Sequence, residues 1–164
     1  MGVWLGPRGA KELVIDLASL TAKGDKWNGT EYVDALAPTI TTSTGVVSIT
    51  KHWTGNVETG YGNDKAGIAV SGALDLTDYS KITVAFSDLN SNGHIAVYVS
   101  TSNTDFVMTR DIINQYDFSG SSVELDVSSC GVCYFGIAIE ATGRAESTQD
   151  ITKTITISSI KATK

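Results

Sequence analysis

The chain has 164 residues, of which 41% are hydrophobic and 18% are charged, and its formal net charge is −6. This length fits one domain with a substantial core. The acidic balance argues against a nucleic-acid partner and against an anionic membrane surface, because both need a basic surface. No apolar run reaches the roughly 20 residues that span a bilayer.

Residues 1–38 are less regular than the rest, and we expect them to form an N-terminal arm with a first strand, or an added edge. The first eight residues contain no basic segment followed by an apolar stretch, so no signal peptide is predicted. Trp4 has apolar neighbours on both sides, and an exposed tryptophan in that setting favours contact with another subunit. We therefore expect a homo-oligomer with Trp4 at the contact.

Residues 39–164 show the alternation of apolar and polar side chains that is typical of half-buried strands. Turn-forming residues separate the alternating runs. About eight strands in one domain predict an all-β fold, a single-domain antiparallel β-sandwich or a barrel. Short helices are expected only at 32–36 and 112–116. The expected strands are 13–17, 46–51, 67–71, 82–86, 95–99, 123–127, 134–140 and 154–162.

The segment between strands 82–86 and 95–99 contains Asn92-Gly93, a pair that favours tight hairpin turns. It predicts that these two strands are antiparallel neighbours.

Asp88, Asn90 and Asn92 in the same segment have the spacing of the first half of a calcium-binding loop. The twelfth position of such a loop needs a bidentate glutamate, and here it is Val99. We expect no metal or other cofactor, and a calcium ion completed by a remote carboxylate is the alternative.

Cys130 and Cys133 are the only cysteines of the chain. A redox Cys-x-x-Cys motif places its first thiol at a helix N-terminus, whereas Cys133 leads directly into a strand pattern. A structural zinc site needs four ligands, and the two histidines, His52 and His94, lie far from each other and from the cysteines. We expect a structural pair, either as buried thiols or as a local disulfide in a turn.

Glu124, Asp126 and Ser129 follow a pattern that resembles the catalytic strand of jelly-roll β-glucanases. Ser129 stands where that strand has its second glutamate, and a retaining glycosidase needs two carboxyl groups. The sequence also lacks a nucleophile elbow, a phosphate loop and a zinc-protease motif. We predict that the protein is not an enzyme.

The segment from residue 52 to residue 64 places aromatic rings among Asn, Asp, Glu and His in glycine-rich loop sequence. Such a mix suits stacking on a sugar ring and hydrogen bonding to its hydroxyls. The alternative for Trp53 is packing over the end of the core. Tyr98 and Tyr116 also offer flat faces. The expected carbohydrate-binding residues are Trp53, Tyr61, Asn63, Asp64 and Trp27.

Residues 74–84, Leu-Asp-Leu-Thr-Asp-Tyr-Ser-Lys-Ile-Thr-Val, resemble a strand entry of jelly-roll domains similar to carbohydrate-binding modules and galactose-binding-like domains. Segments 123–128 and 134–139 resemble the later strands of these domains, and 156–162 resembles their closing strand. The resemblance covers roughly residues 39–164 and implies a jelly-roll sandwich. Such domains commonly bind glycans, and they also occur as accessory and tail domains of phage virions.

We therefore predict a non-catalytic bacteriophage or prophage virion protein, in the tail, baseplate or capsid-surface decoration, that adheres to host or surface glycans. Its opening, Met-Gly-Val-Trp-Leu-Gly-Pro, loosely resembles small phage tail proteins. This setting implies synthesis in the host cytoplasm, action outside the cell, and other virion proteins as partners. The alternative is a stand-alone carbohydrate-binding module, and a divergent jelly-roll glycan hydrolase ranks third.

Overall fold

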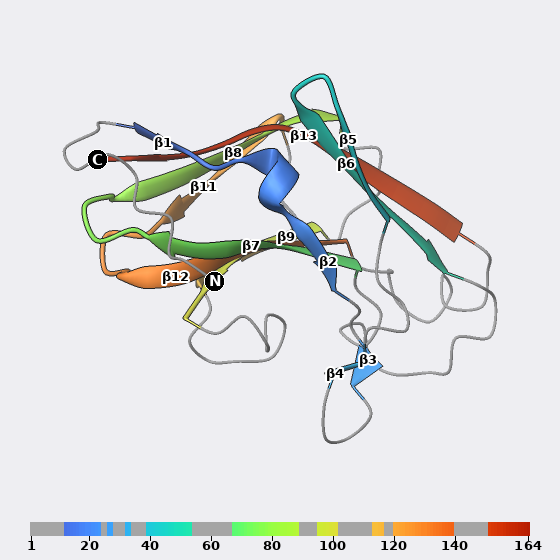
Figure 1. The fold of residues 1–164 in the computed structure, drawn as a ribbon, viewed down its shortest axis with the longest axis horizontal. Helices are drawn as coiled ribbons and strands as arrows, with labels where there is room; N and C mark the ends of the chain where they lie inside the picture. The colour runs from blue at the N-terminus through green and yellow to red at the C-terminus, as the bar shows by residue number, and fades with distance from the viewer. Residues whose placement is uncertain are drawn as a thin grey trace.

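The structure is a computed structural model that describes residues 12–23, 26–27, 32–33, 39–53, 67–88, 95–101, 113–116, 120–139 and 151–164. Two antiparallel sheets pack face to face (Figure 1). Among these residues no helix is long and apolar enough to cross a membrane.

The first sheet, which we call the β13 sheet after its central strand, has the order β11-β8-β13-β6-β5, with β1 also paired to β13. Its strands are β11 (Ser122–Asp126), β8 (Lys81–Asp88), β13 (Ile151–Thr163), β6 (Val46–Trp53), β5 (Thr39–Ser43) and β1 (Glu12–Val14).

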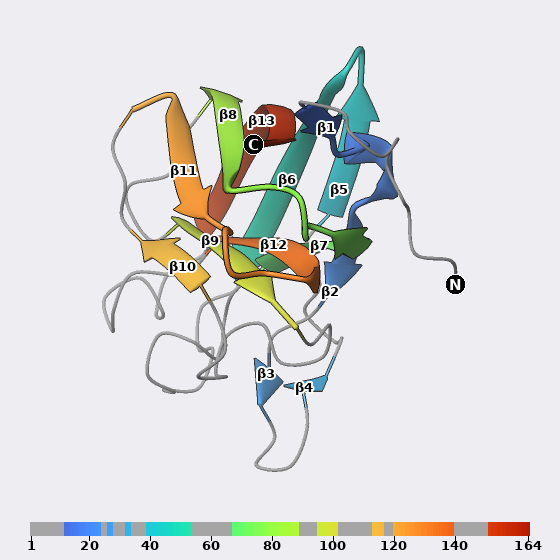
Figure 2. The same cartoon turned by 90° about the vertical axis from the view of Figure 1, so that its left-hand side faces the viewer.

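The second sheet, the β12 sheet, has the order β10-β9-β12-β7-β2. Its strands are β10 (Ile113–Tyr116), β9 (Ile95–Ser100), β12 (Val132–Ile139), β7 (Gly67–Asp75) and β2 (Thr21–Lys23). A separate pair, β3 (Lys26–Trp27) and β4 (Tyr32–Val33), lies on the side of the β12 sheet that faces away from the β13 sheet (Figure 2).

Eight strands, β6 to β13, form the jelly roll. The chain places β6, β8, β11 and β13 in one sheet and β7, β9, β10 and β12 in the other, and every pairing is antiparallel. The predicted all-β antiparallel sandwich of jelly-roll type is therefore confirmed.

The predicted hairpin between 82–86 and 95–99 is wrong, because the two strands lie in different sheets. β8 pairs with β11 and β13, whereas β9 pairs with β10 and β12. All six residues of β9 are buried, so this strand needs cover on both faces and not only on one. Its apolar run indicated that environment, and the turn-favouring pair Asn92-Gly93 does not outweigh it.

Both predicted helices are wrong where the structure describes them. Ile113–Tyr116 forms β10 and pairs with β9, and Tyr32–Val33 forms β4 and pairs with β3. These segments carry β-branched and aromatic side chains, which suit a strand once a partner strand is available.

The strand expected at 13–17 ends early, at Val14. The Asp16 carboxylate accepts a hydrogen bond from the Ala18 amide at 2.9 Å and caps a short 3-10 turn, η1 (Leu17–Ser19). The chain then enters β2, so residues 12–23 add one strand to each sheet. The first eleven residues lie outside the described part of the chain.

The core fills the space between the sheets and continues on the outer face of the β12 sheet. There Val70, Ala96, Tyr98 and Ala138 form a second buried cluster, with Tyr134 packed against it. Tyr98 stands opposite Gly136 and is completely buried. It therefore presents no open face to a sugar, and its proposal as an exposed aromatic is wrong.

A β-bulge in the β12 sheet depends on one buried hydroxyl. The register between β12 and β7 shifts between Tyr134 and Gly136, which takes Phe135 out of the regular ladder. The Phe135 amide donates instead to the Ser71 hydroxyl at 2.9 Å, and that hydroxyl donates to the Gly72 carbonyl at 2.8 Å. Ser71 thus replaces a missing ladder bond.

Ser71→Ala should lower the free energy of unfolding by about 1–3 kcal/mol, because it leaves the buried Phe135 amide without its acceptor. Urea denaturation measures this change. Ser158→Ala removes an exposed hydroxyl that donates to the Ala85 carbonyl, and it should cost less than about 0.5 kcal/mol. Equal effects of the two substitutions would contradict the role given to Ser71.

Candidate functional site

The predicted sugar-binding segment begins and ends at one end of the sandwich. Trp53, the last residue of β6, pairs with Ile151, the first residue of β13. The chain enters β7 at Gly67, which pairs with Ile139 at the end of β12. We call this the loop end, on the right in Figure 1.

The connections 54–66, 89–94, 117–121 and 140–150 start and finish at the loop end, and the chain also leaves β2 there. Loops on a rigid sandwich can change in sequence without loss of the fold. The end that carries them is therefore suited to binding a ligand. The jelly-roll topology thus brings the ends of strands that are distant in sequence to one end of the sandwich.

The structure describes some of the predicted site residues fully, others by their backbone alone, and others not at all. Trp53 ends β6, and Trp27 pairs with Tyr32 in the β3–β4 pair, but their side chains lie outside the description, as do those of Tyr116 and His52. Asp88 ends β8 and is exposed. The predicted residues that lie wholly outside the described part of the chain are Trp4, Tyr61, Asn63, Asp64, Asn90 and Asn92. In the described ranges no three His, Cys, Asp or Glu side chains gather as a metal site would need.

The opposite end of the sandwich, which we call the turn end, contains the turns 76–80 and 127–131, and the connection from β9 to β10 also starts and finishes there. Two backbone hydrogen bonds join these turns. The Leu76 amide donates to the Gly131 carbonyl at 2.9 Å, and the Val127 amide donates to the Ser80 carbonyl at 2.8 Å. The two turns are therefore held together by backbone hydrogen bonds.

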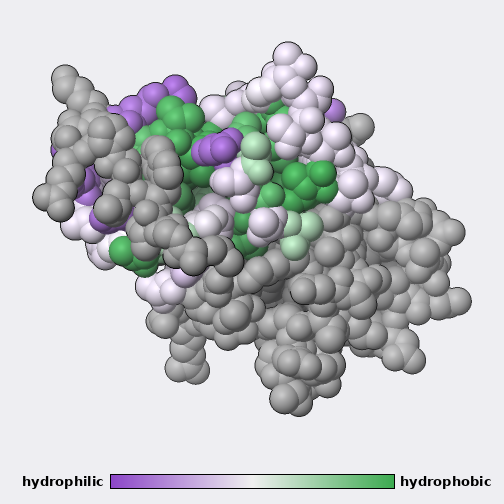
Figure 3. Space-filling model, viewed as in Figure 1, coloured by the Kyte–Doolittle hydropathy of each residue, from purple (hydrophilic) through white to green (hydrophobic). Residues whose placement is uncertain are grey.

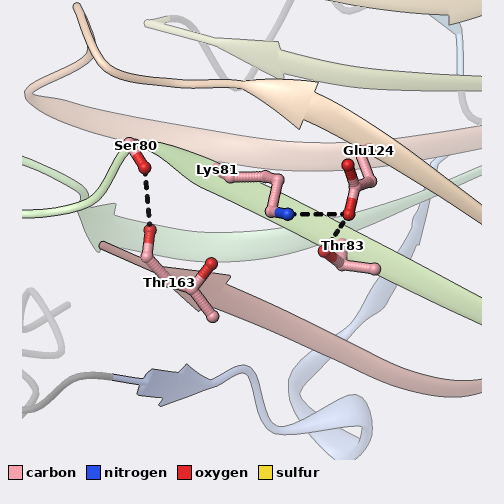
Figure 4. A network of polar contacts seen from close by, with 5 residues as sticks. All are labelled: Ser80, Lys81, Thr83, Glu124 and Thr163. Carbon is pink, nitrogen blue, oxygen red and sulfur yellow. Dashed lines mark hydrogen bonds and ion pairs between the residues drawn. The ribbon is translucent and has the colours of Figure 1, made fainter.

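A shallow polar cavity of about 540 Å³ opens at the turn end. Lys81 Nζ lies 2.8 Å from Glu124 Oε1, and Thr83 Oγ1 lies 3.5 Å from the same oxygen (Figure 4). Register places Glu124 opposite Thr83 and Asp126 opposite Lys81, so the lysine reaches the carboxylate diagonally. The lining residues are Ser80, Lys81, Glu124, Leu125, Asp126 and Ser128.

Both carboxyl groups of this cavity favour the ionised form. The hydrogen bond from Lys81, aided by its charge and by Thr83, lowers the pKa of Glu124. The hydroxyl and amide of Ser128 lower the pKa of Asp126. A glycosidase acid needs a carboxyl group that holds its proton near neutral pH. Neither group meets that requirement.

Sequence reasoning singled out Glu124 and Asp126 by a motif but missed Lys81. The two partners of the ion pair are 43 residues apart, and only the pairing of β11 with β8 brings them together. No signal in the sequence links them.

A second cavity, of about 380 Å³, lies where β1 and η1 pass β7. Its lining is mainly apolar and includes Val14, Ala73 and Leu74, and Figure 3 shows hydrophobic surface on this side of the molecule. Its polar side chains, Asp16 and Ser19, serve the 3-10 turn, since the Ser19 hydroxyl donates to the Asp16 carbonyl at 2.6 Å. It is less suited to a sugar than the polar cavity.

Cys130 and Cys133 are free thiols, the first half-buried and the second buried. Burial, followed by the charge and the hydrogen bond of Cys130, raises the pKa of Cys133 to about 11. Of the two structural alternatives, the structure contains the thiols and not the disulfide.

Solved structures with the same fold include binding and adhesion domains. One is a low-affinity xylan-binding module, CBM86, from the gut symbiont Roseburia intestinalis, with a TM-score of 0.55 and 13% identity over 92% of this chain and 93% of that chain. The others are two cleaved adhesin domains of Lys-gingipain. The K2 domain gives a TM-score of 0.50 and 11% identity over 93% of this chain and 99% of its own.

The K1 adhesin domain, from Porphyromonas gingivalis, gives a TM-score of 0.50 and 16% identity over 93% of this chain and 98% of its own. No protein-family model matches the sequence, and no curated protein matches it significantly. At these identities the similarity establishes a shared fold over nearly the whole chain.

Lys81→Met should raise the pKa of Glu124 toward its ordinary value of 4.5, because Lys81 is the main cause of the lowering. A carboxyl group with a lowered pKa stabilises the fold above its unfolded pKa, and this stabilisation is lost as the pH falls through the folded value. NMR titration of the Glu124 side chain measures the shift.

Lys161→Met is the matched control, since Lys161 forms the corresponding ion pair with Glu12 at 3.1 Å. It should leave the Glu124 titration unchanged. A Glu124 pKa that stays low in Lys81→Met would show that Lys81 is not its cause.

Proposed function

We propose that the protein is a non-catalytic glycan-binding module that mediates adhesion, with its site at the loop end. The observation that carries this proposal is the jelly-roll topology, which returns the segment between Trp53 and Gly67 to one end of a rigid sandwich. The similarity in fold to a xylan-binding module and to adhesin domains supports it.

The residue types at the loop end fit this role. Trp53 and Tyr61 supply aromatic faces for the apolar side of a sugar ring. Asn63 and Asp64 supply amide and carboxylate groups for its hydroxyls. Trp27, in the β3–β4 pair outside the β12 sheet, adds a further aromatic face in this proposal.

A catalytic role is less well supported. Glu124 and Asp126 are ionised and engaged by Lys81 and Ser128, and Ser129 carries no carboxyl group. A divergent glycan hydrolase would need its acid and its nucleophile elsewhere. Binding without turnover is the simpler account of this surface.

Of the two settings that the sequence suggested, a stand-alone carbohydrate-binding module has the more direct support, because the similar structures are binding and adhesin domains. The virion setting rests on the sequence alone. In both settings the module itself binds glycans.

Wild-type protein should bind saturably to bacterial cell walls or to insoluble polysaccharides, including xylan, in a pull-down assay. Trp53→Ala and Tyr61→Ala should each reduce the affinity by about tenfold or more, as the loss of a central aromatic anchor does. Circular dichroism and thermal melting confirm that the variants fold.

Lys81→Ala, at the turn end, is the control and should bind like the wild type. Binding that is lost in Lys81→Ala and kept in the aromatic variants would move the site to the polar cavity. Absence of binding to every glycan would overturn the proposed function.

Self-association is a separate part of the proposal and concerns Trp4. If this residue docks on a neighbouring subunit, the intact protein should be a symmetric oligomer. Trp4→Ala should shift it toward the monomer in size-exclusion chromatography with light scattering. A wild-type monomer at high concentration would remove homo-oligomerisation and leave other virion proteins as the partners of Trp4.

A further inference from the structure

Cys130 lies in the connection from β11 to β12, where the chain crosses from one sheet to the other, and Cys133 is the second residue of β12. The Cys130 amide donates to the Val127 carbonyl at 2.9 Å, and Cys133 is paired with Leu74 in the β12–β7 ladder. Between them, the Gly131 carbonyl accepts from Leu76. The backbone of both cysteines is therefore held in place by neighbouring elements.

Both side chains pack with the main core cluster. Cys133 is 2% exposed within the main cluster, and Cys130 packs against that cluster while remaining partly exposed. The two thiols are separated by only two residues in the chain, and the influence of Cys130 is among the causes that raise the pKa of Cys133. Two thiols so close in the chain, on backbone that is held in place and against the same cluster, are candidates for a covalent bond.

The two intervening residues leave room for a closed ring. Val132 is half-exposed, and a Cβ atom built on Gly131 would meet no atom within 4 Å. A ring closed through Cys130 and Cys133 can therefore adjust on its solvent side without displacing the core.

We propose that this pair is a redox modification site, at which a low-molecular-weight disulfide oxidises Cys130 and Cys133 to an intramolecular disulfide. This bond would link the connection after β11 to the start of β12. The proposal concerns the end of the sandwich opposite the proposed glycan site and does not depend on glycan binding.

The difference in exposure fixes the order of the reaction. Cys133 is buried and keeps its proton at neutral pH, because its pKa is about 11, so the oxidant meets Cys130 first. The Cys130 thiolate attacks one sulfur of the small disulfide, forms a mixed disulfide and releases one thiolate.

Cys133 then loses its proton to water and attacks the sulfur of Cys130, which expels the second small thiolate. The mixed disulfide carries no negative charge on Cys130, which removes one cause of the raised pKa of Cys133. Overall, the protein loses two electrons and two protons, and the small disulfide is reduced to two thiols.

The test treats the folded full-length protein with oxidised glutathione at mildly alkaline pH and follows thiol content and intact mass. The wild type should lose both thiols and two hydrogen atoms without keeping an adduct. Cys133→Ala should stop at a glutathione adduct on Cys130. Cys130→Ser should react at least about tenfold more slowly than the wild type, because only the buried thiol remains.

A wild type that keeps both thiols, or that accumulates the glutathione adduct, would overturn the proposal. Circular dichroism before and after oxidation checks that the fold is retained. The oxidised protein should melt a few degrees higher than the reduced protein, since the ring restricts the unfolded chain. A lower melting temperature would show that the folded geometry does not accommodate the bond.

Discussion

The central position of β13 is the constraint on which the rest of the structure depends. This strand of 13 residues pairs with β8 along one edge and with β6 and then β1 along the other. Its inward residues include Ile155, Ile157 and Ile160, all fully buried. The spacing from Ile157 to Ile160 is three and not two, because a register shift at Ser158 inserts one residue. Without that bulge, half of the strand would turn its apolar side chains to solvent.

The outer faces of the two sheets differ, because one is buried and the other is polar. The β12 sheet is covered on both faces, with Tyr98 and Val70 buried on the outer one. The outer face of the β13 sheet is polar, and the pairs Ser48–Thr156 and Thr50–Thr154 hydrogen-bond across neighbouring strands at 3.0 Å and 2.9 Å. The proposed glycan site lies at one end of the sandwich, where the strands stop and the connections begin.

The two ends differ in character. At the turn end, polar side chains form hydrogen bonds with nearby residues. The Ser128 amide and hydroxyl, for example, donate to the Asp126 carboxylate at 2.9 Å and 2.7 Å. Cys130 and Cys133 lie in the same region, where their motif leads into β12 and not into a helix. The connections at the loop end carry aromatic and amide side chains. Chemical modification and ligand binding are in this way proposed for opposite ends of one scaffold.

The sequence by itself determined the fold class and most strands, because alternation of period two is a local property of the chain. It also indicated that Glu124 and Asp126 are not the catalytic pair of a retaining glycosidase, because Ser129 stands where the second glutamate is required. Only the tertiary structure decided which strands are neighbours, that Tyr98 is covered, and that Lys81 meets Glu124. The physical reason is that strand pairing joins residues far apart in the chain, and burial depends on both faces of a sheet, whereas local patterning reports on one segment at a time.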